Sequence, residues 1–311
     1  MRAWLISGLF VGLSVVGMCR ADPPVAPVTH RQFQAVNANG EQTYTATQKV
    51  VLEGIVLHHP ADMLDPTPDD AITTTYNLGG QWQLFLQGEG DDHAGTAVYL
   101  AQLYDNLPWV MTGGYSNREY IAELARLNAA RFSPGDRIRV TGRFLSYKGK
   151  MNVNEQHNKN PDRDFTIELL EPGVGLPRPE VVSLDELKDE QDRFIFDPER
   201  LAGGEYYQAR LIKIEDVNVV DPNTWGPSGE IVVTDGIRTL PVKLGRGNGI
   251  YQGSYNLVEP FDVIGILDQE STNLRNGYRL YVMDYDGNGH VLAAYEHRMA
   301  DVRSEGDPNA M

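Results

Sequence analysis

Two aromatic side chains are the first candidates for binding chemistry in this sequence. The segment QWQLFLQ at 81–87 alternates as a strand with one face in a core does, which directs Trp82 inward and Phe85 outward. On the next segment, TAVYLA at 96–101, the same alternation directs Tyr99 outward. Outward rings on neighbouring strands can stack on bases or sugars, so we predict a ligand platform at Phe85 and Tyr99. The alternative is that the second half of the chain or the N-terminal lead-in covers both rings.

Basic side chains form a second candidate site, along one face of the segment 137–147 and in the turn that follows. They are Arg137, Arg139, Arg143, Lys148 and Lys150. We predict that Arg139 and Arg143 contact a ligand, because such a stripe can bind a phosphate or a sulfated glycan. The alternative needs no ligand: if this strand lies between the first and last strands of a barrel, Glu53 and Glu168 can pair with its arginines.

The segment DYDGNGHV at 284–291 is similar to the first half of an EF-hand calcium loop. Asp284, Asp286 and Asn288 would supply ligands at positions 1, 3 and 5. Position 12, where such a loop needs a bidentate carboxylate, is Tyr295. Weak calcium binding is therefore the functional interpretation, and an ordinary turn at the end of a strand is the alternative.

We find no catalytic constellation in the sequence. No serine stands in a nucleophile elbow, and no glycine-rich phosphate loop follows a strand. His58 and His59 could join Asp91, Asp92 and His93 in a transition-metal site, but a barrel would place the two groups at opposite ends.

The N-terminus is typical of a secretory signal peptide. Arg2 precedes an apolar run at 3–18, which is shorter than the ~20 residues of a membrane span, and Ala21 offers a small residue for cleavage. We predict a signal peptide at 1–21 and an exported protein, periplasmic or extracellular, that loses its only cysteine, Cys19. Lipid attachment would need a small residue where Met18 stands. The sequence has no second apolar run long enough to span a membrane.

Acidic residues dominate the charge. Removal of Arg2 and Arg20 with the signal lowers the 27 basic residues to 25 against 43 acidic ones, a net charge of −18. Such a field repels phosphate backbones and so disfavours nucleic acid as a partner, although it serves solubility equally well.

Short strands divided by turns predict a mainly β protein with two similar modules. In the first, we expect strands at 50–58, 81–87, 96–101, 137–147 and 164–170. A helix at 116–131 is predicted between the third and fourth strands, because Ser116 and Glu119 form a capping box and apolar residues recur at helical spacing. This is the order of the OB-fold, a five-stranded Greek-key barrel.

The second half repeats the strand pattern without the helix. Its expected strands lie at 206–220, 230–234, 237–244, 261–268 and 278–285, and Gly265 takes the place of Gly142 in the fourth strand. The predicted domains are an extended lead-in at 22–44, an OB-like barrel at 45–172, a linker at 173–204, a second barrel at 205–293 and a polar tail at 294–311. The linker is expected to hold a short helix at 183–192, where Ser183 and Glu186 form another capping box.

At this level the chain resembles the OB-like modules of secreted bacterial proteins, including those that accompany extracellular nucleases. The likeness is carried by SPGDRIRVTG at 133–142, leading into Lys148-Gly149-Lys150, and by PRPEVVSLDEL at 177–187, and it extends over most of 45–290. In that family the nuclease chemistry belongs to separate domains. The resemblance therefore implies an accessory or binding module.

Our leading hypothesis is an exported, non-catalytic binding or scaffold module whose first barrel engages an oligosaccharide, a nucleic acid or a protein. The rival is a divalent-metal-dependent phosphodiesterase or nuclease, or an accessory domain of one. A structural envelope component without a small ligand is a third hypothesis. The sequence leaves the oligomeric state open.

Overall fold

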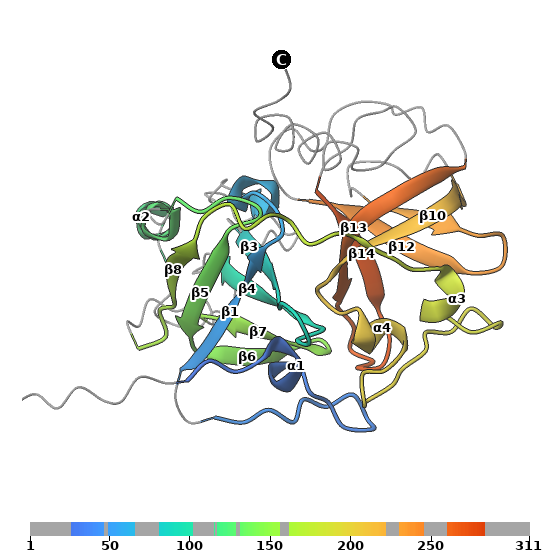
Figure 1. Cartoon of the computed structure of the whole chain (residues 1–311), viewed down its shortest axis with the longest axis horizontal. Helices are drawn as coiled ribbons and strands as arrows, with labels where there is room; N and C mark the ends of the chain where they lie inside the picture. The colour runs from blue at the N-terminus through green and yellow to red at the C-terminus, as the bar shows by residue number, and fades with distance from the viewer. Residues whose placement is uncertain are drawn as a thin grey trace, which may run out of the picture.

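The computed structural model describes residues 26–46, 49–65, 81–101, 115, 117–128, 131–155, 162–221, 230–245 and 260–283. The protein is mainly β, as predicted, and its strands form two sheets that lie side by side (Figure 1).

The first sheet contains a closed five-stranded barrel. Its strands are β1 (Val50–Val56), β3 (Gln81–Gln87), β4 (Gly95–Ala101), the pair β5 (Arg137–Gly142) and β6 (Phe144–Tyr147), and β7 (Lys150–Asn154). The strands β1, β3 and β4 pair in antiparallel order, β4 pairs in parallel with β7, and β7 pairs with β6. Closure follows because β5, which runs on into β6, pairs with β1. A short 3-10 helix, η1 (Pro60–Met63), and β2 (Leu64–Asp65) lie beside β3.

The predicted fifth strand at 164–170 is wrong in its place in the barrel. That segment forms β8 (Thr166–Glu171), which adds to the outer side of β5, whereas the fifth barrel strand is β7. The sequence predicts a turn at the start of β7, because the polar residues Lys150, Asn152 and Asn154 are not typical of buried strand positions. All five residues of β7 are buried in the structure.

The helix α2 (Asn117–Asn128) follows the third barrel strand and precedes the fourth, as predicted. Its side chains Tyr120, Leu124 and Leu127 are buried in the core of the first barrel. Ile121, which the helical pattern also included, is instead 55% exposed.

The second sheet repeats the pairing order of the first. Its strands are β10 (Leu211–Val219), β11 (Glu230–Thr234), β12 (Thr239–Leu244), β13 (Phe261–Gln269) and β14 (Tyr278–Val282). Antiparallel pairs join β10 to β11 and β11 to β12, a parallel pair joins β12 to β14, and antiparallel pairs join β14 to β13 and β13 to β10. The short β9 (Glu180–Val181) adds in parallel to β10.

Short helices lie in the segments that precede each barrel. The expected linker helix is α3 (Leu184–Leu187), with Ser183 and Glu186 in the predicted capping box. The helix α4 (Gly203–Tyr206) ends where the strand at 206–220 was expected to begin, and that strand begins instead at Leu211. The lead-in, which we expected to be extended, contains α1 (His30–Phe33), capped by Thr29. The ring of Phe33 is fully buried in the core of the first barrel, so this segment is part of the fold.

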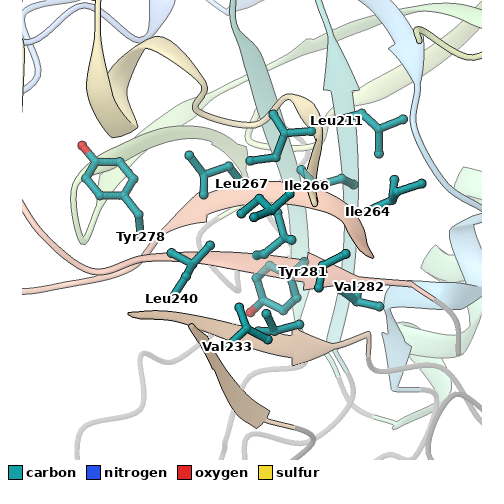
Figure 2. Packing of buried hydrophobic residues seen from close by; sticks show 14 of the residues in the cluster. Leu211, Val233, Leu240, Ile264, Ile266, Leu267, Tyr278, Tyr281 and Val282 are labelled. Carbon is teal, nitrogen blue, oxygen red and sulfur yellow. The ribbon is translucent and has the colours of Figure 1, made fainter. Parts of the chain in front are cut away.

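The two barrels meet through a shared apolar cluster. Leu57, Met63, Phe85 and Ala97 of the first barrel belong to the same buried cluster as the core residues of the second. Figure 2 shows the second-barrel part of this cluster, with Tyr281 among Val233, Ile266 and Val282. Backbone groups also join the barrels, since the Gly95 N–H donates to the Gln208 carbonyl oxygen at 3.1 Å. In the described part of the chain, no helix is long and apolar enough to cross a membrane.

Candidate functional site at the junction of the two barrels

Phe85 does not stand on an open face. It is fully buried, its ring centroid lies 6.1 Å from that of Tyr281 on β14, and the ammonium of Lys150 lies 6.0 Å from its ring centroid. The expectation that Phe85 offers an exposed stacking surface is therefore wrong, and the alternative, in which the second barrel covers the ring, describes the structure. The alternation of the strand predicts that the Phe85 ring points outward, but it does not predict which residues cover the ring.

Tyr99 is half-buried on β4, where it pairs with Gln83 of β3 on one side and with Asn154 of β7 on the other. It therefore lies on the same outer face as Phe85, two residues along from Ala97, which is buried in the shared cluster. Ligand binding by Tyr99 stays a prediction.

Arg139 is paired across the sheet in the way that the alternative interpretation expected. Its register partners are Glu53 on β1 and Glu168 on β8, and its guanidinium lies 2.7 Å and 2.8 Å from their carboxylate oxygens. Arg137, two residues earlier, pairs with Glu89 and Glu171. The basic stripe is thus neutralised by neighbouring strands, and ligand binding by Arg139 stays a prediction.

The remaining basic residues of the stripe have partners in different parts of the chain. Arg143, between β5 and β6, donates from Nε to the backbone oxygen of Asp162 at 3.3 Å, and its role in ligand binding stays a prediction. Lys148 and Lys150 reach across to the second barrel, where they pair with Glu270 and Asp268.

The predicted calcium ligands Asp284, Asp286 and Asn288 lie outside the described residues. Within the described ranges, no group of three or more His, Cys, Asp or Glu side chains could hold a metal ion. The histidines have other partners: the buried His58 accepts the Phe85 N–H at its Nε2, 3.1 Å away, and donates from Nδ1 to the His59 carbonyl oxygen. Burial lowers the pKa of His58 to about 4, so this ring is neutral at physiological pH.

The turn between β3 and β4 joins three parts of the chain. Asp92 accepts the backbone N–H groups of His30 and Arg31 at 2.6 Å and 2.7 Å, which fixes the start of α1. His93 stacks on the ring of Tyr206 at 3.8 Å between centroids and hydrogen-bonds to Glu180 at 2.9 Å. This turn therefore holds the lead-in on one side and the second module on the other.

Charged pairs at the junction were not found from the sequence. The Lys150 ammonium lies 2.5 Å from a carboxylate oxygen of Asp268, and both side chains are almost fully buried. Glu270 accepts from Lys148 at 2.9 Å and also pairs with Arg279. Although burial by itself raises the pKa of Glu270, the charge of Arg279 and the hydrogen bond from Lys148 lower it to about 2. The sequence signal was the Lys148-Gly149-Lys150 turn, whose partners lie about 120 residues away, too far for local pattern reasoning.

A second titratable group, also missed, lies at the opposite side of the first barrel beneath α2. Glu155, directly after β7, is fully buried and accepts the hydroxyl proton of Tyr115 at 2.5 Å and the Phe165 N–H at 3.4 Å. Burial raises its pKa to about 7, and the carboxylates of Glu123 and Asp164 add to that shift. Such a group exchanges a proton near neutral pH, a property that buried structural sites share with catalytic ones.

The charged side chains discussed above form contacts within the chain. The junction can fix two barrels in one arrangement, and the Glu155 cluster can hold a proton. Comparisons of this chain with protein-family models, curated proteins and solved structures find no match.

Proposed function

We propose that this is an exported, non-catalytic binding or scaffold protein made of two OB-like barrels, in which the outer face of β11 and β12 receives a protein partner. The OB assignment is supported by the strand order, which is the same in both sheets and is that of the OB-fold. It is also supported by two glycines in the fourth strands: Gly142 pairs with Val50 and Gly265 with Ile212, each near the start of the first strand. A Cβ at either glycine would collide with neighbouring atoms.

The observation that carries the proposal is a difference between the second and third strands of the two barrels. All seven positions of β3 are buried, because its inward face fills the first core and its outward face meets the rest of the chain. In β11 and β12, by contrast, buried and half-buried positions alternate strictly. The face on which OB-folds usually bind ligands is therefore partly open along both strands of the second barrel, whereas on β3 and β4 of the first only Tyr99 is half-buried.

The side chains of that face favour a protein over other partners. They are Glu230, Val232, Thr234, Thr239, Pro241 and Lys243. None of these six is aromatic, so the stacking that holds bases and sugars on such faces has no support here. The net charge of −16 also opposes a nucleic-acid backbone. A small, mixed apolar and polar surface of this kind fits another protein.

Site-specific photo-cross-linking in the producing cell tests the proposal. A photoreactive side chain at Val232, at the middle half-buried position of β11, should give a discrete protein adduct. The same side chain at Thr166, which is exposed on β8 of the first barrel, is the matched control and should give none. Equal labelling from both positions would contradict the proposed surface.

A second assay separates this proposal from its enzymatic rival. The mature protein is incubated with DNA, RNA and bis-p-nitrophenyl phosphate in magnesium, manganese or calcium, and we expect no turnover. Hydrolysis that a chelator abolishes would replace the binding interpretation with a metal-dependent phosphodiesterase.

A further inference from the structure

Arg200 is a buried arginine at the point where three parts of the chain meet. It lies shortly before α4, is 2% exposed and has a left-handed backbone with φ of 56°, a conformation that costs energy for a residue other than glycine. Its Nη1 donates to the Gln34 carbonyl oxygen at 3.2 Å, to Glu205 at 2.9 Å and to the Gln208 side-chain oxygen at 3.4 Å. The guanidinium thus touches the N-terminal segment and two residues that precede the second barrel.

The other edge of the same guanidinium has no partner. Among the described residues, nothing accepts from Nε or Nη2 of Arg200, and the side-chain nitrogen of Gln208 is also buried without an acceptor. Buried donors in folded proteins are almost always satisfied, because an unsatisfied one costs free energy. These unsatisfied donors of two neighbouring side chains therefore call for an acceptor other than the described residues.

The geometry of the free edge indicates the kind of acceptor. Nε and Nη2 project from one side of the planar guanidinium as a fork, which matches two oxygens of a carboxylate or phosphate. The carboxylate of Glu205 does not occupy the fork, since it meets Nη1 with one oxygen and accepts the Tyr278 hydroxyl with the other at 2.5 Å.

We propose that the free fork of Arg200, together with the Gln208 amide, binds a small tetrahedral oxyanion such as inorganic phosphate or sulfate. The site is complete only when the N-terminal segment lies against the second module, because Gln34 holds Arg200 from one side and Glu205 from the other. A bound oxyanion stabilises that arrangement. This inference does not depend on the protein partner proposed above.

Thermal unfolding of the full mature chain, titrated with phosphate or sulfate at constant ionic strength, tests the site. A ligand that binds only the folded state raises Tm in proportion to the logarithm of its concentration once that exceeds Kd, by about 5 °C at a hundredfold excess for a chain of this size. Chloride at the same ionic strength is the reference for a general salt effect.

Two variants should abolish the increase in Tm that phosphate or sulfate causes. Arg200→Lys keeps the charge and removes the fork, and Gln208→Glu places a carboxylate beside the guanidinium, where it repels the anion. Gln208→Glu keeps the acceptor for Nη1, so it remains informative if Arg200→Lys does not fold. Arg238→Lys, which alters a guanidinium already bonded to the Lys188 backbone oxygen, is the matched control and should keep the response.

A larger Tm increase with phosphate or sulfate than with chloride, in the wild type and in Arg238→Lys but not in Gln208→Glu, supports the site. Equal responses in all of these proteins would show a general ionic effect and overturn the proposal. A wild type that responds no more to phosphate or sulfate than to chloride would overturn it too, since water would then satisfy the donors.

Discussion

Glu155 and Glu270 are both enclosed glutamates, yet their surroundings shift their pKa values in opposite directions. Beneath α2, burial raises the pKa of Glu155 to about 7, and the nearby Glu123 and Asp164 make its ionisation harder still. At the barrel junction, the charge of Arg279 and the hydrogen bond from Lys148 outweigh burial and bring the pKa of Glu270 to about 2. At pH 7, Glu155 is therefore partly protonated, whereas Glu270 is ionised.

The difference lies in how many bases accompany the carboxylates. Around Glu155, three carboxylates lie near Arg126, and Lys49 acts on Asp164 alone, so the cluster gains from keeping one proton. At the junction, Lys148, Lys150 and Arg279 face Asp268 and Glu270. Folding in the first region is therefore favoured by protonation, and folding in the second by full ionisation.

The largest expected effect is at the buried pair of the junction. Lys150→Met should lower the free energy of unfolding by about 3–5 kcal/mol, because it leaves the carboxylate of Asp268 buried without its partner. Urea denaturation with tryptophan fluorescence measures the change.

Two further variants are controls for Lys150→Met. Lys150→Met/Asp268→Leu removes both charges and should recover most of the lost stability. Lys213→Met, which breaks a more exposed pair with Asp262, should cost only about 0–1 kcal/mol. A loss in Lys150→Met no larger than in Lys213→Met would mean that the junction does not depend on its buried ion pair.

The next effect concerns the pH dependence from Glu155. Its folded pKa, about 7, lies above the unfolded value of 4.5, so the folded protein binds more protons between these pH values. Its contribution to stability is therefore present below pH 4.5 and is lost as pH rises through 7, by up to about 3 kcal/mol.

Glu155→Gln should remove that slope while keeping an acceptor for the Tyr115 hydroxyl. Stability of wild type and variant is measured from pH 4.5 to 8, and the difference between them isolates Glu155 from other groups such as His58. Glu168→Gln, at an exposed carboxylate, should leave the slope unchanged. If the wild-type and Glu155→Gln curves stay parallel, Glu155 does not titrate near neutral pH.

These two regions also show what the sequence could predict. Strand alternation and the capping box located most strands and α2, because period and caps are local properties. The pairing of Arg139 with Glu53 and Glu168 was foreseeable once the strand order was assumed. The strand β7 was missed because its polar side chains are buried, Lys150 against Asp268 of the second barrel, and no local pattern reports such burial.

The burial of Phe85 and the positions of Glu155 and Arg200 depend on contacts between distant segments. Alternation gives the face to which Phe85 points, but only the packing of the second barrel decides what covers that face. Arg200 and Gln34 are separated by more than 160 residues, and nothing in either local sequence indicates that they meet.

The backbones of the two barrels come close together at Gly95. A Cβ at Gly95 would collide with the carbonyl oxygens of Ala209 and Leu86, so Gly95→Ala should lower stability by about 1–3 kcal/mol. Gly90→Asn is the control, because Gly90 has a left-handed φ of 60°, which asparagine tolerates, and open space around it. Urea denaturation of both variants measures the contrast, and an unaffected Gly95→Ala protein would show that the barrels can move apart at no cost.

The smallest effect is expected at Glu270 and has the opposite pH dependence to that of Glu155. Because its folded pKa of about 2 lies below 4.5, its contribution is present above pH 4.5 and is lost as pH falls toward 2. Glu270→Gln should therefore cost about 1 kcal/mol at pH 7, a modest value because the side chain is partly exposed to screening water. The deficit should shrink steadily in acid, where the wild-type carboxylate also loses its charge. A deficit that is constant from pH 7 to pH 2.5 would mean that Glu270 acts through packing, and the contrast with Glu155 would then not be one of charge.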